Sequence, residues 1–107
     1  MKKIKLLDCT LRDGGYVNDW NFSNKQIDKI LNSLSKSNID IVEYGYLNDT
    51  KGKKDNSTLF DNINIISNLI DNLQCSLIEK VVMINLGDYN IDKLPEKNKT
   101  KIDGIRL

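Results

Sequence analysis

The chain has 107 residues and a formal net charge of +1, from 16 basic and 15 acidic side chains. This length fits one domain and excludes a complete (β/α)8 barrel, which needs about 250 residues. The balanced charge excludes the basic footprint of a nucleic-acid-binding protein, and no apolar run approaches the ~18 residues of a membrane span. Two cysteines do not make a disulfide framework, and the lack of histidine excludes a Ser-His-Asp triad or a histidine metal site within this chain alone. No segment has the pattern of a secretion signal, so we expect a cytoplasmic protein.

The first half of the chain predicts a strand, a loop and a helix. The apolar run over 3–9 is typical of a buried strand, and the stretch 11–22, with its Gly-Gly pair, is expected to be a loop. Ser23 is the expected helix N-cap, because Gln26 three residues later completes a capping box. The helix is expected to end near residue 37. Its apolar positions repeat at helical spacing: Ile27, Ile30, Leu31 and Leu34.

The second half continues this alternation. Residues 39–47 are apolar and β-branched, and they predict a second strand that carries one carboxylate, Glu43. The polar stretch 48–58 is expected to be a loop, and apolar spacing predicts a helix over about 59–73. Two further strands are expected at 79–86 and 102–107, with one helical turn near 91–94 between them.

Strands that alternate with helices predict an α/β fold with about four parallel strands. A helix between two strands returns the chain to the same end of the sheet, so the strands pair in parallel, with right-handed crossovers. Such βα units form either an open sheet or half of a barrel, and periodicity alone does not separate these two architectures.

Charged side chains gather at the carboxyl end of the first predicted strand, where ligand sites of α/β proteins lie. Asp13 offers a hard oxygen ligand for a divalent cation, and Arg12 offers a planar positive fork for a carboxylate or an enolate oxygen. Glu43, on the second strand, is expected at the same mouth, where it can hold Arg12 in a bidentate pair. The plainer interpretation is a solvated turn with a surface ion pair. Asp8 has two equally good interpretations: a further polar group at the mouth, or a carboxylate that only ends its strand.

Other noticeable residues favour structural interpretations. Trp20 and Phe22 are expected to form a hydrophobic plug before the first helix. The lysine-rich run at 51–54 is typical of a solvated loop, with phosphate binding as the weaker alternative. Tyr44 and Tyr46 flank a glycine at the mouth of the second strand, where one of them can line a pocket.

The stretch D-C-T-L-R-D-G-G-Y at Asp8–Tyr16 closely resembles the opening motif of the DRE-TIM metallolyases. Within that superfamily, which is also described as HMGL-like, the 4-hydroxy-2-oxovalerate aldolase branch is the most similar. This branch is favoured because Gly-Gly-Tyr follows the Arg-Asp pair in this chain, and I-V-E-Y-G-Y follows one helix later. The resemblance covers essentially residues 1–107. It implies the N-terminal half of an aldolase-type TIM barrel domain, truncated at its C-terminal end.

The resemblance also implies roles for individual residues. Arg12 would stabilise the enolate of a pyruvate-like fragment, Asp13 would bind Mn²⁺ or Mg²⁺, and Glu43 would hold the arginine. These aldolases place a histidine base where this chain has Tyr16, which can donate a proton but is a poor base because its ordinary pKa is about 10. A His-x-His pair on a late strand completes the metal shell in the family, and this chain has no histidine.

The sequence therefore predicts a carbon–carbon lyase that acts on a small 2-oxo acid. The divalent metal would bind only when residues from outside this chain complete its site, so the chain alone is expected to be inactive. Its expected protein partner is a second copy or a complementing C-terminal half; neither nucleic acid nor membrane is expected. The alternative is a non-catalytic α/β domain or subunit that binds a partner chain or a small anion through Arg12.

Overall fold

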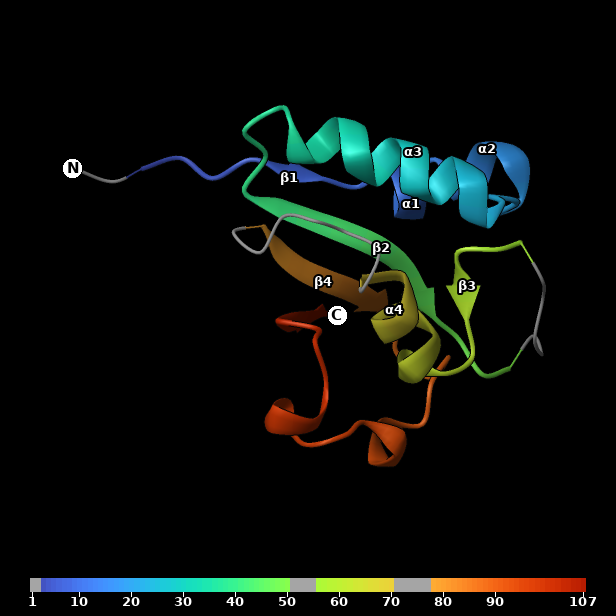
Figure 1. Cartoon of the computed structure of the whole chain (residues 1–107). Coiled ribbons are helices and arrows are strands. Elements are labelled where there is room, and N and C mark those ends of the chain that lie inside the picture. The colour runs from blue at the N-terminus through green and yellow to red at the C-terminus, as the bar shows by residue number, and fades with distance from the viewer. Residues whose placement is uncertain (1–2, 51–55, 71–77) are drawn as a thin grey trace.

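The structure is a computed structural model that describes residues 3–50, 56–70 and 78–107. Strands and helices alternate along the described residues, except that no helix is described between β2 and β3 (Figure 1). The strands are β1 (Leu7–Asp8), β2 (Ile41–Leu47), β3 (Leu59–Phe60), β4 (Glu79–Ile84) and β5 (Gly104–Arg106). The α-helices are α1 (Thr10–Asp13), α2 (Gly15–Asn18), α3 (Asn24–Ser35) and α4 (Ile63–Ile70), and two 3-10 turns, η1 (Ile91–Lys93) and η2 (Lys97–Lys99), precede β5.

All strand pairs of the described sheet are parallel, as predicted. The order is β1-β2-β4-β5, and β3 also pairs with β2. Since β4 lies along one edge of β2, both β1 and β3 lie along its other edge, near opposite ends. The register sets Glu43 beside Val81 and Val81 beside Gly104, so these three residues form one row across the sheet.

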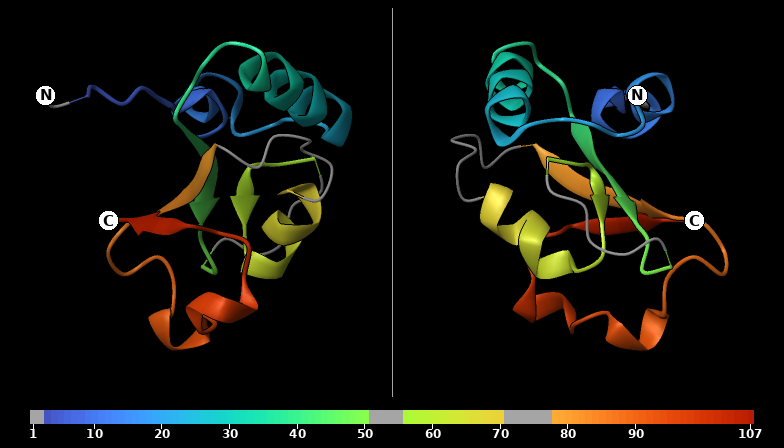
Figure 2. Two further views of the ribbon diagram at one scale, coloured as in Figure 1. Left: turned by 60° about the vertical axis from the view of Figure 1, so that its left-hand side comes forward. Right: turned by 90° about the vertical axis from the view of Figure 1, so that its right-hand side faces the viewer.

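Helices α3 and α4 cover the same face of the sheet. In both views of Figure 2 they lie on one side of the strands. Their buried residues belong to one hydrophobic core together with alternate residues of β2 and β4. The main contributors are Ile27, Leu31, Val42, Tyr44, Leu47, Ile63, Ile66, Val82 and Ile84. The opposite face is therefore free of these helices, and it carries the charged side chains described below.

The capping box predicted for the first long helix is confirmed. The Ser23 hydroxyl accepts a hydrogen bond from the Gln26 amide at 3.2 Å, and the Gln26 side chain accepts one from the Ser23 amide at 2.9 Å. These two bonds satisfy amides that have no partner inside the helix. The apolar stripe behind them buries Ile27 and Leu31.

The prediction of a loop over 11–22 is wrong in part, because two short helices, α1 and α2, occupy this stretch. The Asp8 carboxylate accepts hydrogen bonds from the amide and the hydroxyl of Thr10, and the Cys9 carbonyl accepts one from the Asp13 amide at 2.7 Å. These local bonds turn the chain immediately after β1. Asp8 therefore ends its strand and starts the turn that presents Arg12.

The predicted helix over 59–73 begins four residues later than expected. Leu59–Phe60 is strand β3, and the Asn62 side chain accepts the amide of Asn64 to start α4. The apolar spacing of Leu59 with Ile63 is helical, but Leu59 pairs with Tyr46 of β2 instead. Tertiary pairing overrides local periodicity here. The expected C-terminal end of this helix and the lysine-rich run at 51–54 lie outside the described residues.

The remaining elements match the predictions with shorter ends, and the helical turn expected near 91–94 is η1. The segments that follow β2 and β4 are joined by Asp49. Its amide donates to the Asp88 carbonyl at 2.9 Å, and its carboxylate accepts the Asn90 amide and the Lys93 ammonium, each at 3.1 Å. Among the described residues, no helix is long and apolar enough to cross a membrane.

Candidate functional site

A bulge in β2 places two side chains of the candidate site on the same face of the sheet. The register between β2 and β4 shifts between Glu43 and Tyr46. Gly45 inside this bulge has φ of +146°, a backbone conformation that favours glycine. A Cβ atom at Gly45 would lie 2.2 Å from the Thr58 carbonyl oxygen. Glycine is therefore required both for the bulge and for the close approach of the chain that leads into β3.

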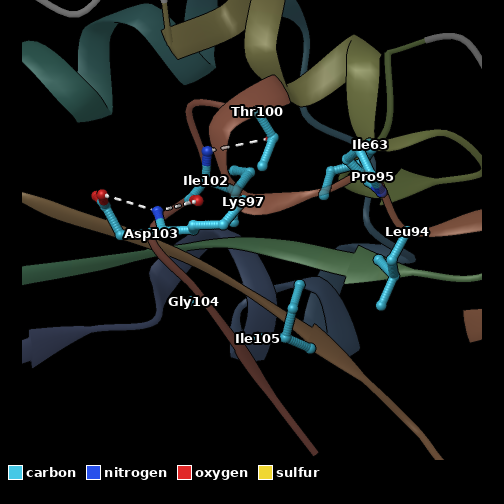
Figure 3. Close-up of a pocket in the computed structure, with 9 residues that line it drawn as sticks. All are labelled: Ile63, Leu94, Pro95, Lys97, Thr100, Ile102, Asp103, Gly104 and Ile105. Carbon is cyan, nitrogen blue, oxygen red and sulfur yellow. Dashed lines mark hydrogen bonds and ion pairs between the residues drawn. The ribbon is translucent and has the colours of Figure 1, made fainter.

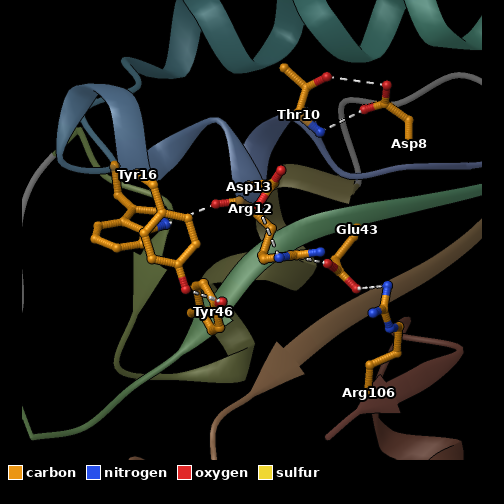
Figure 4. Close-up of polar contacts among 9 residues, drawn as sticks. Asp8, Thr10, Arg12, Asp13, Tyr16, Glu43, Tyr46 and Arg106 are labelled. Carbon is orange, nitrogen blue, oxygen red and sulfur yellow. Dashed lines mark hydrogen bonds and ion pairs between the residues drawn. The ribbon is translucent and has the colours of Figure 1, made fainter.

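Arg12 and Glu43 form an ion pair, in the arrangement that the sequence predicts (Figure 4). The Arg12 Nε donates to Glu43 Oε1 at 2.5 Å; the Glu43 side chain is fully buried and that of Arg12 is 15% exposed. Burial by itself lowers the pKa of Arg12, but the hydrogen bond and the charge of Glu43 raise this pKa by more. Arg12 is thus a fixed, permanently charged group.

The expected bidentate pair is not what forms, because the second oxygen of Glu43 belongs to another arginine. Oε2 lies 3.0 Å from Nη1 of Arg106, which reaches across the sheet from β5 (Figure 4). This contact is an ion pair without hydrogen-bond geometry. The sequence interpretation missed Arg106. Strand alternation in I-D-G-I-R-L, which sets Gly104 and Arg106 on one face, is the signal that could have found it.

A cluster of three aromatic rings lies beside Arg12. The rings of Tyr16, Trp20 and Tyr46 meet edge to face, with centroids 4.8 to 6.2 Å apart. The Trp20 indole donates to the Arg12 carbonyl at 3.0 Å, and Cζ of Arg12 lies 6.0 Å from the centre of the Tyr46 ring. Trp20 packs so closely on Gly15 that a Cβ atom there would lie 1.9 Å from the indole. The second glycine of the motif therefore makes room for Trp20.

Tyr16 is 60% exposed and lies at the edge of this cluster. Its hydroxyl is 2.7 Å from that of Tyr46, and this hydrogen bond raises the pKa of Tyr16 above its ordinary value. A raised pKa keeps the phenol protonated at neutral pH. Tyr16 is therefore suited to donate a proton and unsuited to act as a base.

Asp13 offers the exposed carboxylate of the site. Its side chain is 64% exposed, and Oδ1 lies 3.3 Å from Nη1 of Arg12. Among the described residues, no group of three or more acidic, cysteine or histidine side chains is arranged to hold a metal ion. Glu43 has both oxygens engaged by arginines and Asp8 binds Thr10, so Asp13 alone is a poor fit for a bound cation.

A separate cavity of about 150 Å³ lies on the helix-covered side, between α4, the 3-10 turns and β5 (Figure 3). Its lining is mainly apolar. Lys97 also lines it, and the ammonium of Lys97 donates a hydrogen bond to the Ile102 carbonyl at 2.9 Å. None of the predicted site residues lines it. Among the described residues, the candidate site therefore lies at Arg12 and Glu43 and not at this cavity.

Comparisons of the chain with protein-family profiles, with curated proteins and with solved structures gave no match. The resemblance of the motif at Asp8–Tyr16 to the DRE-TIM metallolyases therefore rests on the residues of the motif themselves.

Proposed function

We propose that this chain carries the arginine side of a carbon–carbon lyase site that acts on a small 2-oxo acid, within the N-terminal half of an aldolase-like (β/α)8 barrel. One observation carries the proposal: Arg12 is held by the buried Glu43 immediately beside the exposed carboxylate of Asp13. The parallel sheet, with α3 and α4 on one face only, is consistent with part of a barrel.

The chemistry follows from what Arg12 can do. In the cleavage of a 4-hydroxy-2-oxo acid, a base removes the 4-hydroxyl proton and the C3–C4 bond breaks. The electron pair of that bond forms the C2–C3 double bond of an enolate, and an aldehyde leaves. Negative charge collects on the oxygen at C2. A guanidinium has five N–H donors, and Arg12 donates one to Glu43 and one to Asp13, so further donors remain for this oxygen.

Tyr16 is the candidate proton donor. Its raised pKa keeps it protonated, so it can return a proton to C3 of the enolate, and the base for the 4-hydroxyl must come from elsewhere. Asp13 contributes one carboxylate toward a divalent cation such as Mn²⁺ or Mg²⁺. The described donors do not complete a metal shell, so residues from outside them would have to supply the other ligands.

A second candidate is a non-catalytic α/β domain that binds a small anion through Arg12. Among the described residues, no further acidic, cysteine or histidine side chains join the exposed Asp13 in a group that could hold a metal. This favours the second candidate, because a lyase of this type needs a complete set of metal ligands.

Solvent deuterium uptake at C3 of pyruvate separates the two candidates. The protein that the complete gene encodes is tested with and without Mn²⁺. If the lyase proposal holds, exchange requires Mn²⁺ and falls on the order of 10²–10³-fold in Arg12→Ala, because one oxyanion donor is lost. Arg12→Lys should be the next most damaging and Glu43→Gln the least. Lack of exchange in the Mn²⁺-loaded protein would contradict the lyase and leave the anion-binding domain.

A further inference from the structure

We infer that Arg106 is the second arm of the anion site: Arg12 and Arg106, bridged by Glu43, together bind a carboxylate whose neighbouring carbon carries a second anionic oxygen, the pattern of a 2-oxo acid. The inference rests on the proposed function for the identity of the substrate, but its geometry stands on Arg12, Arg106 and Glu43.

The distribution of arginine in the chain supports this inference. The sequence has 14 lysines and two arginines, and the two arginines contact the same carboxylate from opposite edges of the sheet, one after β1 and one on β5. At every other basic position the chain has lysine, and the two positions that have arginine meet at one site. Arginine differs from lysine in presenting a planar fork that matches carboxylate geometry.

The charge balance around Glu43 shows that Arg106 is not needed to neutralise it. Glu43 is completely buried, and Arg12, with a side chain only 15% exposed, already supplies one positive charge to it. Arg106 adds a second positive charge, and the exposed Asp13 carboxylate, 3.3 Å from Nη1 of Arg12, is the second negative charge nearby. Arg106 has no carboxylate partner besides Glu43 among the described residues, so its charge is available to a bound anion.

The position of Arg106 leaves its outer donors accessible. Its side chain is 42% exposed, and Glu43 is its one charged partner among the described residues. Gly104 lies on the same face of β5 as Arg106 and next to Val81 of β4, and it has no side chain to cover the arginine. Arg106 reaches diagonally over β4 from beside Met83 to Glu43, so its outer N–H groups face the open side of the sheet.

Together these features suit a ligand with anionic oxygens on adjacent carbons. The free donors of Arg106 bind the carboxylate, and those of Arg12 bind the oxygen at the neighbouring carbon. Arg106 is then a substrate-binding residue that selects 2-oxo acids over compounds with one isolated carboxylate.

Oxalate is the probe, because it is planar and carries anionic oxygens on two adjacent carbons. The intact chain is titrated with oxalate and followed by nitrogen-15 NMR of the arginine Nε–H groups, which gives only two signals because the chain has two arginines. Both signals should shift with one dissociation constant. Fluorescence of Trp20, the single tryptophan, should report the same constant through its contact with Arg12. Acetate and phosphate should bind at least tenfold more weakly than oxalate.

Arg106→Gln should weaken oxalate binding tenfold or more, whereas Lys99→Gln, which removes one exposed charge elsewhere, should change it less than twofold. Arg106→Lys keeps the ion pair with Glu43 and tests the fork separately. It should retain the melting temperature and still lose the preference for oxalate over acetate. Equal weakening in Arg106→Gln and Lys99→Gln, an unmoved Arg106 signal, or equal affinity for phosphate would overturn the inference.

These outcomes are independent of turnover. Oxalate binding through both arginines without deuterium exchange in pyruvate would remove the lyase and keep the two-arginine site. Deuterium exchange in pyruvate, together with oxalate binding that Arg106→Gln does not weaken, would keep the lyase and remove the two-arginine site.

Discussion

Glu43 is the residue on which the site depends. Removing a buried charge from a pair leaves its partner without a counter-ion and typically costs about 3–5 kcal/mol. Here Glu43 has two arginine partners, and one of them, Arg12, is itself largely buried. Glutamine at this position keeps the shape and one acceptor, so it removes the charge with less damage to the packing.

We therefore expect Glu43→Ala to lower the free energy of unfolding by about 3–5 kcal/mol, and Glu43→Gln to lower it by less. The matched control is Glu79→Ala, which breaks the exposed pair with Lys5 and should cost about 0–1 kcal/mol. Urea unfolding of the three variants measures this difference. Equal losses in Glu43→Ala and Glu79→Ala would contradict the central role of Glu43.

The phenol pair gives the site a defined response to alkaline pH. The hydrogen bond to Tyr46 raises the pKa of Tyr16, so the folded state favours the protonated phenol. The stability that this bond contributes is fully present below the ordinary tyrosine pKa of about 10 and is lost as pH rises through the higher pKa of the folded state. Tyr46→Phe should return the pKa of Tyr16 toward about 10. Absorbance titration of tyrosinate, with Tyr16→Phe to identify its signal, measures the change.

At the residue scale, the sequence was sufficient where neighbouring residues determine the contact. Asp8, Arg12 and Asp13 lie in one short stretch, 8–13. The pairing of Arg12 with Glu43 follows from parallel pairing, since β1 ends at Asp8 beside Val42, next to Glu43. Arg106 required the order of the sheet, since it contacts Glu43 across β4 and no local pattern specifies that neighbour.

Among the elements, the bulge in β2 is the one that determines the site geometry. An alanine at Gly45 meets the Thr58 carbonyl at 2.2 Å and also requires an unfavourable positive φ. Gly87 also has positive φ, +87°, but its added Cβ would meet no atom within 4 Å. Alanine at Gly87 therefore introduces backbone strain alone, whereas alanine at Gly45 introduces backbone strain and a steric clash.

Gly87→Ala should cost about 1 kcal/mol from backbone strain alone, and Gly45→Ala should cost clearly more, about 2–4 kcal/mol. The Gly45 variant should also disturb Tyr46, and with it the fluorescence of Trp20, whereas the Gly87 variant should leave both unchanged. Equal unfolding free energies in the two variants would show that the close approach of Thr58 is unimportant.

The elements that the sequence predicted well are those with a complete local signal. The helix after Ser23 has a cap, a capping box and an apolar stripe. Strand β3 has no such signal, because two residues pair with β2 only once the bulge has formed. The short helices α1 and α2 depend on bonds from Asp8 and Cys9 that periodicity does not register.

At the scale of the whole molecule, the described sheet leaves apolar and backbone groups open. Strand β5 pairs with β4 alone among the described strands, and Ile105 and Leu107 on and beside it are 37% and 82% exposed. Exposed edges with apolar side chains promote pairing with further strands.

We expect concentration-dependent self-association in sedimentation velocity, weakened by Ile105→Lys because the charge opposes edge pairing. Val17→Lys is the control, since Val17 is 91% exposed and lies in α2, outside the strands. A clean monomer at high protein concentration, or equal weakening by both variants, would contradict association through this edge.

The bonds of Asp49 imply that two distant segments open as one unit in native-state hydrogen exchange. Its amide and carboxylate join residues 88–93 to the end of β2, so neither segment can release its amides without breaking the same contacts. The amides of Asp49 and Asn90 should therefore exchange at one common opening rate. The Asn90 amide and Lys93 lower the pKa of Asp49, so this opening should become easier as pH falls through that pKa and the carboxylate becomes protonated.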